Sequence, residues 1–432
     1  MSLAEPLTPP TAARWRWRRL LDAPHRTAFS AGAVLLAASG LWWAAAMFAF
    51  GLPAPASAWR WAVSPGVAHA LLLGWGAIPF YFAGFLCTTA PKWLAAPPLP
   101  ARALLAPVGA ALVGWALVFA GVHGARIVAA TGAALVAAGH GGVVLLLLRL
   151  LRASAAPDRL HAHIAIAGYA ACVAALAVAA VALGVGADAA ARTALVAGLW
   201  AGIGIVFAAA LHRLVPFFGA VALPPLDARW PAWLLWTMLG ALAFEAAATI
   251  AAALGDATPP LLAVRAAIEA VFATLLLGLA VRWAFVQNLR LRLIAMLHLG
   301  FVWLGVAFAL AAVSHALAAA GAAGLGFAPL HALGAGCYGS VLLAMVTRVS
   351  AGLAGRTIAA DDVTWRLFAL LQAAVLARIG AALWLDAARW LLPLAALLWA
   401  AATATWAVRC IGWYGRPRID GRQRSASFGR VT

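Results

Sequence analysis

Long apolar runs, repeated along the whole chain, constrain this sequence more than any other feature. The chain has 432 residues, of which 66% are hydrophobic and 10% are charged. A soluble domain is typically about 45–50% apolar and about 25% charged, so one or two water-soluble domains could not bury this much apolar surface. Disorder is excluded because disordered segments are poor in apolar residues. The remaining fold class is an all-α, polytopic integral membrane protein embedded in the lipid bilayer.

The apolar runs predict about twelve transmembrane helices. A hydrocarbon core about 30 Å thick requires about 20 apolar residues in each helix. The predicted spans are Thr27–Phe50, Pro65–Ala90, Ala103–Gly121, Ile127–Leu148, Ile164–Leu183, Thr193–Leu214, Ala232–Leu254, Leu261–Val281, Ile294–Ala318, Phe327–Val346, Leu367–Leu385 and Trp390–Val408. The chain therefore divides into a basic N-terminal tail (1–26), a twelve-span transmembrane domain (27–410) and a basic C-terminal tail (411–432).

The net charge of +18 is a topology signal rather than a sign of nucleic-acid binding. Short cytoplasmic loops of membrane proteins are enriched in Lys and Arg. Of the 30 Lys and Arg residues, 24 fall in the two tails and the even-numbered loops, and four fall in the odd-numbered loops. We therefore expect both tails to be cytoplasmic. No connection is long enough to form a basic binding face, so no nucleic-acid partner is expected.

Most of the histidines fall into two layers, one near each face of the predicted bilayer. Neutral imidazole is a common ligand of transition metals and haem iron, so two histidines from different helices at one depth are candidates for axial haem ligation or a copper site. The alternative is that each histidine hydrogen-bonds a nearby helix end. The outer layer comprises His69, His331, His315 and His123, and the inner layer His161, His163, His212 and His298.

Four charged residues lie deep within predicted spans: Glu245, Arg265, Glu269 and Arg378. Charged groups at membrane depth are costly unless they are paired or have a function. Arg265 and Glu269 are four residues apart and therefore share one face of a helix. All four residues are expected between the middle of the membrane and its outer side. We interpret them as a structural network that neutralises its own charge, with a proton path as the alternative.

Several segments, in the same order, resemble motifs of the NnrS family of bacterial membrane proteins. They begin with H-A-L-L-L-G-W from His69 to Trp75 and A-G-F-L-C-T-T-A-P-K-W from Ala83 to Trp93. The others are H-R-L-V-P-F-F from His212, H-L-G-F-V-W from His298, H-A-L-G-A-G from His331, M-V-T-R-V-S from Met345 and the pair Gly355–Arg356. The resemblance covers most of the chain, from the second span to the start of the eleventh.

This resemblance implies a multi-pass protein of the bacterial cell inner membrane that contains haem and copper and is linked to nitric oxide metabolism or protection from nitrosative stress. The histidines that match the family motifs, and are therefore candidate cofactor ligands, are His69, His212, His298 and His331. Three positions depart from the pattern, because Val67, Ala70 and Leu353 stand where the family has His, Glu and His. A reduced ligand set is therefore expected. We expect His69 and His331 to ligate one metal or haem iron, with His315 as a further candidate metal ligand.

Two other functions remain open on the sequence alone. One is transport of a small solute or metal, with the same histidines used transiently. Inverted internal repeats would favour a transporter, and no similarity between the two halves of the chain is detected. The other is a non-catalytic partner of a membrane redox enzyme, although almost no soluble loop is predicted. The sequence predicts neither the oligomeric state nor the reaction.

Overall fold

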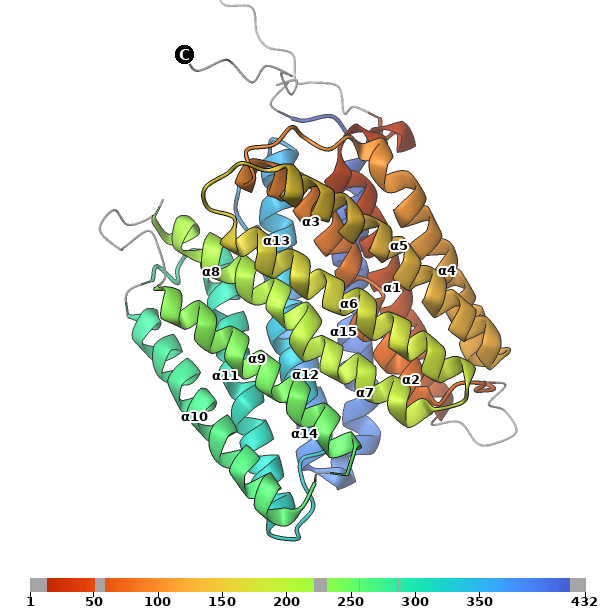
Figure 1. Ribbon diagram of the computed structural model, residues 1–432, viewed down its shortest axis with the longest axis vertical. Coiled ribbons are helices and arrows are strands. Elements are labelled where there is room, and N and C mark those ends of the chain that lie inside the picture. Colours follow the sequence, from red (N-terminus) through yellow and green to blue (C-terminus); the bar gives the residue numbers. More distant parts are fainter. Residues whose placement is uncertain (1–13, 51–58, 221–230, 256, 286, 420–432) are drawn as a thin grey trace, which may run out of the picture.

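The protein is a bundle of long helices. The structure, a computed structural model, describes residues 14–50, 59–220, 231–255, 257–285 and 287–419, without the side chains of residues 215–220. These residues contain helices and no strands, and twelve helical segments among them are long and apolar enough to cross a membrane (Figure 1). The predicted all-α polytopic fold and the predicted number of spans are therefore confirmed.

Seven spans are single α-helices, two begin with a 3₁₀ turn, and three are interrupted by a π-helical segment. The single helices are α1 (Pro24–Phe50), α5 (Arg126–Ala153), α6 (Leu160–Gly184), α9 (Ala232–Ala253), α10 (Pro259–Ala284), α11 (Arg292–Ala319) and α14 (Asp362–Leu383). The 3₁₀ turns η3 (Ala101–Leu104) and η6 (Leu385–Ala387) precede α4 (Leu105–His123) and α15 (Ala388–Tyr414). Most helices run a few residues beyond the predicted span, because long Arg side chains at their ends can reach the polar headgroup region.

The three interrupted spans are the second, sixth and tenth. The second consists of α2 (Pro65–His69), η2 (Ala70–Trp75) and α3 (Ile78–Trp93). The sixth consists of α7 (Asp188–Gly198), η4 (Leu199–Gly204) and α8 (Ile205–Ala220). The tenth consists of α12 (Ala328–His331), η5 (Ala332–Tyr338) and α13 (Gly339–Leu353). π-helical turns are rare in proteins overall, but those that occur often lie at functional sites. Three of them in one bundle therefore indicate that a functional site lies among these three spans.

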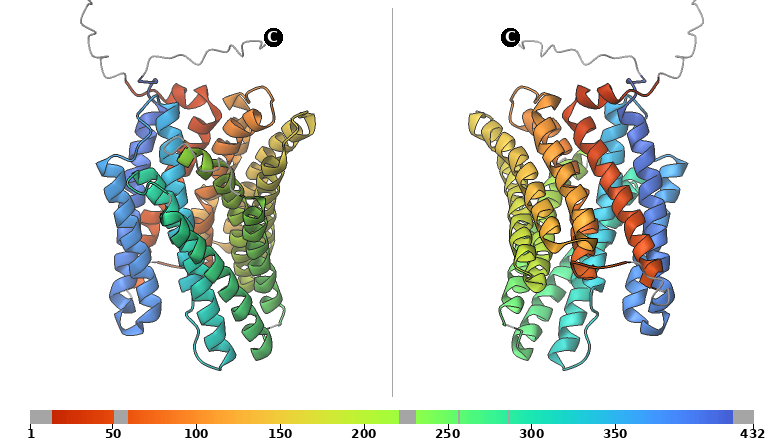
Figure 2. Two further views of the ribbon diagram at one scale, coloured as in Figure 1. Left: turned by 90° about the vertical axis from the view of Figure 1, so that its left-hand side faces the viewer. Right: turned by 90° about the vertical axis from the view of Figure 1, so that its right-hand side faces the viewer.

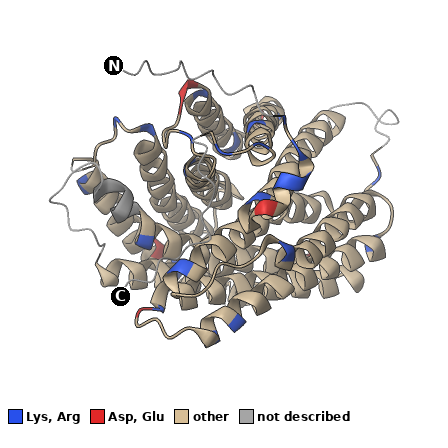
Figure 3. Cartoon of the chain, turned by 90° about the horizontal axis from the view of Figure 1, so that it is seen from above, with Lys and Arg blue, Asp and Glu red and all other residues tan. Residues whose placement is uncertain are grey.

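The two described ends of the chain meet at one end of the bundle, which we call the terminal end. The backbone N–H of Arg16 donates to the carbonyl of Gly415 at 2.8 Å, and Arg26 Nη1 donates to the carbonyl of Tyr414 at 2.9 Å. Figure 2 shows the 3₁₀ turn η1 (Trp17–Asp22) and the last turn of α15 side by side there. Figure 3 looks onto this end and shows Lys and Arg around it at helix ends and in loops. The side of the membrane that this end faces stays a prediction.

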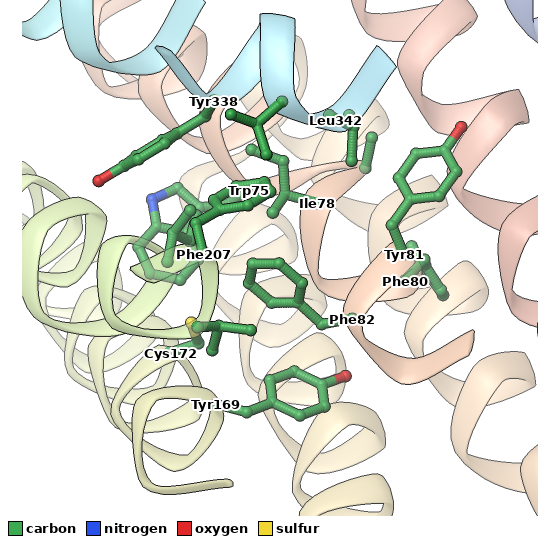
Figure 4. Packing of buried hydrophobic residues seen from close by; sticks show 14 of the residues in the cluster. Trp75, Ile78, Phe80, Tyr81, Phe82, Tyr169, Cys172, Phe207, Tyr338 and Leu342 are labelled. Atoms are coloured by element: carbon green, nitrogen blue, oxygen red, sulfur yellow. The ribbon is translucent and has the colours of Figure 1, made fainter. Parts of the chain in front are cut away.

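The second, sixth and tenth spans form the interior of the bundle. Buried residues make up 78%, 72% and 78% of their most apolar windows, against 28% for the eighth span. Their aromatic side chains pack against one another: the ring of Phe207 lies 5.1 Å from the rings of both Phe82 and Tyr338, centre to centre (Figure 4). These contacts join all three interrupted spans. The other helices surround them and present apolar side chains to the lipid.

Small residues allow close packing between α4 and α5. A Cβ atom on Gly132 would lie 2.5 Å from the carbonyl oxygen of Gly114, and one on Gly121 would lie 2.1 Å from the backbone nitrogen of Ala129. Lipid is as apolar as the helices themselves, so the hydrophobic effect does little to drive their association, and close van der Waals contact has to do so. Glycine is required where the two backbones come this close.

Candidate functional site

The interrupted spans line a cavity of about 430 Å³ together with α1, α14 and α15. Leu73, Leu199 and Ala335, one from each π-helical segment, all line it. The Tyr338 hydroxyl donates a hydrogen bond to the carbonyl of Leu199 at 3.0 Å, which links the segments of the sixth and tenth spans. Pockets for organic ligands and cofactors typically have volumes of about 300–1,000 Å³. The cavity is therefore large enough for a bound group of that size.

Two histidines from different helices meet in the cavity wall. His69 is the last residue of α2, His331 is the last residue of α12, and their ring centres are 5.8 Å apart. His331 Nδ1 lies 2.8 Å from the carbonyl oxygen of Phe327. A carbonyl only accepts hydrogen bonds, so Nδ1 carries the proton and the Nε2 lone pair is left available. His69 Nδ1 is buried and has no hydrogen-bond partner, and Trp43 packs against its ring at 4.3 Å.

Two arginines also line this cavity, Arg378 from α14 and Arg192 from α7. Among the described residues, no carboxylate lies within 4.0 Å of either guanidinium. An uncompensated cation beside an apolar cavity is costly at membrane depth, and an anionic group on a ligand would compensate it. The cavity thus combines a pair of imidazoles, an apolar lining and positive charge.

The other two histidines that match the family motifs lie towards the terminal end of the bundle. His212 in α8 contacts His161 in α6: His212 Nδ1 lies 3.0 Å from His161 Nε2, and the two rings are stacked with their centres 5.2 Å apart. His298 in α11 has a buried Nδ1 without a hydrogen-bond partner. Neither His212 nor His298 lines the cavity. The structure therefore brings together two of the four matched histidines, the pair from the outer layer.

The intramembrane charges divide between two places. Arg265 donates from Nη2 to Glu245 Oε2 at 2.7 Å and from Nε to Glu269 Oε1 at 2.9 Å. His315 Nδ1 lies 2.8 Å from Glu269 Oε2. We call these four residues, on α9, α10 and α11, the carboxyl network. Arg378 is not part of the carboxyl network, since it lies in the cavity wall, and His315 does not line the cavity.

The described part of the chain contains no group of three or more His, Cys, Asp or Glu side chains placed to hold a metal ion. The four cysteines are buried free thiols on separate spans. A copper ion bound by side chains alone usually has at least three protein ligands. Two imidazoles are the number that complete the coordination of haem iron, because the porphyrin provides the other four ligands.

Comparison with known proteins decides the family. The model of the NnrS family, described as NnrS protein, matches residues 19–418, which is nearly the whole chain. The chain belongs to the NnrS family. Comparisons with curated proteins and with solved structures find no match. NnrS membership thus confirms the resemblance of the sequence motifs, and the geometry of the cavity has to be interpreted from this chain's own residues.

The π-helical segments were missed by the sequence analysis, although a weak signal for them is present. The stretches H-A-L-L-L-G from His69, T-A-L-V-A-G from Thr193 and H-A-L-G-A-G from His331 share the pattern A-L-x-x-G. Each lies in an interrupted span, and a π-helical segment overlaps it or directly follows it. These three stretches lie four spans apart, but the same pattern also occurs at Ala182–Gly186, at the end of the fifth span, so the pattern alone does not distinguish the interrupted spans.

Proposed function

We propose that this NnrS protein binds haem through His69 and His331 and acts in nitric oxide metabolism or in protection from nitrosative stress. The observation that carries the proposal is the pair of imidazoles in the wall of the 430 Å³ cavity. Family membership supports it, because the sequence motifs that led to the NnrS family contain these two histidines.

The residues around the pair fit a bound haem. Two imidazoles bonded to one metal at about 2.0 Å each have ring centres no more than about 6.4 Å apart. The observed separation is 5.8 Å. Haem carries two carboxylate groups, and Arg378 provides a cation without a carboxylate partner among the described residues. His69 Nδ1 is buried without a hydrogen-bond partner. Buried polar atoms in native proteins are nearly always hydrogen-bonded, so this atom also supports the presence of a bound group beside His69.

Each residue has a defined role in this proposal. The hydrogen bond from His331 Nδ1–H to Phe327 fixes the ring orientation and leaves Nε2 to face the bound group. Trp43 holds the His69 ring from the side. Haem, when bound, would supply one-electron chemistry. Nitric oxide is uncharged and dissolves in the bilayer, so it can reach a cavity within the membrane without a polar channel.

The cellular setting follows from the same proposal. With both tails cytoplasmic, His69 and His331 lie near the periplasmic face of the inner membrane, because α2 and α12 start at the end of the bundle opposite the terminal end. Any redox reaction there requires electrons, and we propose that a membrane redox partner delivers them. Copper fits this pair less well, because two imidazoles are fewer protein ligands than a copper ion usually has and the described residues place no third His, Cys, Asp or Glu beside them.

The test compares two pairs of histidine variants in detergent-purified protein. We expect the wild type to show a haem Soret band, and H69A and H331A to lose it while the membrane-inserted yield stays similar. The matched controls are H212A and H298A, which remove family-motif histidines at the other end of the bundle and should retain the band. Metal analysis of the same samples detects copper. A wild type without haem or copper, or outer variants that keep the full metal content, contradicts the proposal.

A further inference from the structure

The carboxyl network contains more negative charge than its cation can neutralise. Glu245 and Glu269 are two carboxyl groups that share one guanidinium, that of Arg265. The side chains of Glu245 and Glu269 are 1% and 0% exposed, so water does not screen them. Arg remains charged in proteins, whereas a carboxyl group can be neutralised by a proton. With His315 neutral, two carboxylates and one guanidinium give the network a net charge of −1. One further bound proton makes the network neutral.

The hydrogen bonds indicate which carboxyl group carries the proton. Both oxygens of Glu269 face a donor, since Oε1 accepts from Arg265 Nε and Oε2 lies beside His315 Nδ1. Glu245 differs, because Oε2 accepts from Arg265 while no N–H or O–H group donates to the buried Oε1; the charged group beside it is the Glu269 carboxyl itself. A bare carboxylate oxygen without a donor is the least favourable position for negative charge in an apolar interior. A protonated Oε1 avoids that charge and leaves the hydrogen bond at Oε2 intact.

No other described charge offers a counter-ion to the network. The electrostatic partners of Glu245, Glu269 and His315 are members of the network itself. The other charged residues and histidines on α10, on α11 and on the helices packed against α9 and α11 are not among these partners: Arg282, Arg292, His298, Asp188, Arg192, His212, Arg213, His331 and Arg348. The proton is thus the remaining source of positive charge in the described structure.

We infer that the carboxyl network is a proton-binding site in which Glu245 holds one exchangeable proton. His315 is its most accessible member, with a side chain 23% exposed, and it lies about one turn before α11 ends at Ala319. His315 is therefore the group through which the site exchanges protons with the outside of the bundle. Release of the proton changes the charge of the network by one unit. This site is separate from the histidine pair and does not depend on a bound cofactor.

The composition of the chain makes a spectroscopic test unusually direct. The sequence contains only three glutamates, Glu5, Glu245 and Glu269, and Glu5 lies outside the described residues. Infrared spectra of purified protein with and without ¹³C-labelled glutamate isolate the signals of these three side chains. At neutral pH we expect one carbonyl band of a protonated carboxylic acid, which shifts with the label and shifts again after exchange into D₂O.

Three variants assign the band. E245Q should abolish it, and E5Q, the matched control, should leave it unchanged. E269Q should also abolish it, because Glu245 then releases its proton and becomes the single counter-ion of Arg265. Absence of the labelled band from the wild type overturns the inference without any variant, and so does a band that persists in E245Q. A band that appears only after Na⁺ and K⁺ are removed would show that a metal cation occupies the site, which also overturns it.

Discussion

Removal of the Arg265 charge should destabilise the protein strongly, and removal of one carboxyl group in addition should restore most of the stability. Arg265 is 14% exposed and makes hydrogen bonds of 2.7 and 2.9 Å to two carboxyl groups that are almost completely buried. Breaking a buried ion pair by removing one partner typically costs about 3–5 kcal/mol, because the other charge is stranded. We expect R265M to cost about 4 kcal/mol, about a thousandfold in the unfolding equilibrium.

In the double variant R265M/E269Q no charge is stranded, because the carboxyl group of Glu245 is already neutral. Its stability should therefore return to within about 1 kcal/mol of the wild type. The assay is unfolding of purified protein in mixed micelles with increasing dodecyl sulfate, followed by the fluorescence of the 21 tryptophans. R378M/E269Q is the matched control, because Arg378 is the other intramembrane arginine and contacts neither glutamate; its effects should be additive within about 0.5 kcal/mol. Equal stability of R265M and R265M/E269Q would refute the reasoning.

Three further predictions concern other parts of the molecule. A C-terminal reporter that is active only in the periplasm should be silent, and activity would show that the orientation or the span number is wrong. Gly132→Ala should destabilise the α4–α5 pair by about 1–3 kcal/mol through overpacking, whereas Gly109→Ala, where a Cβ meets open space, should not; equal melting temperatures would contradict this. Burial raises the pKa of the Asp361 carboxyl, but hydrogen bonds from Thr364 and the charge of Arg409 outweigh burial and hold that pKa below its usual value. Asp361 should therefore contribute up to about 1 kcal/mol of stability that is present at neutral pH and lost as the pH falls below about 4, and thermal melts of D361N should lack that part of the pH dependence.

The number of spans could be predicted from sequence because the thickness of the bilayer fixes the length of each crossing. Every crossing needs about 20 apolar residues, and the chain alternates such runs with turns that contain charged residues, Pro or Gly. The same argument gives the depth of each polar residue. Depth was enough to suggest that His69 and His331 lie together, because both stand near the start of a span that begins on the same side.

Depth alone does not give the direction in which a side chain points around its helix. In a soluble protein the alternation of polar and apolar faces supplies that direction, but helices in lipid are apolar on every side. Arg265 and Arg378 therefore looked equivalent in the sequence, whereas the structure places one in the carboxyl network and the other in the cavity wall. His315 likewise shares a depth with His331 and yet lies against Glu269. The packing of the interior spans fixes these directions.

The four-span spacing of the interrupted helices bears on how such a chain could have arisen. A unit of four spans begins and ends on the same side of the membrane, so copies joined end to end insert in one orientation and keep the same bias of basic loops. Units with an odd number of spans would have to alternate in direction. The π-helical segments η2, η4 and η5 have this spacing, and the three helices that carry them therefore cross the membrane in the same direction.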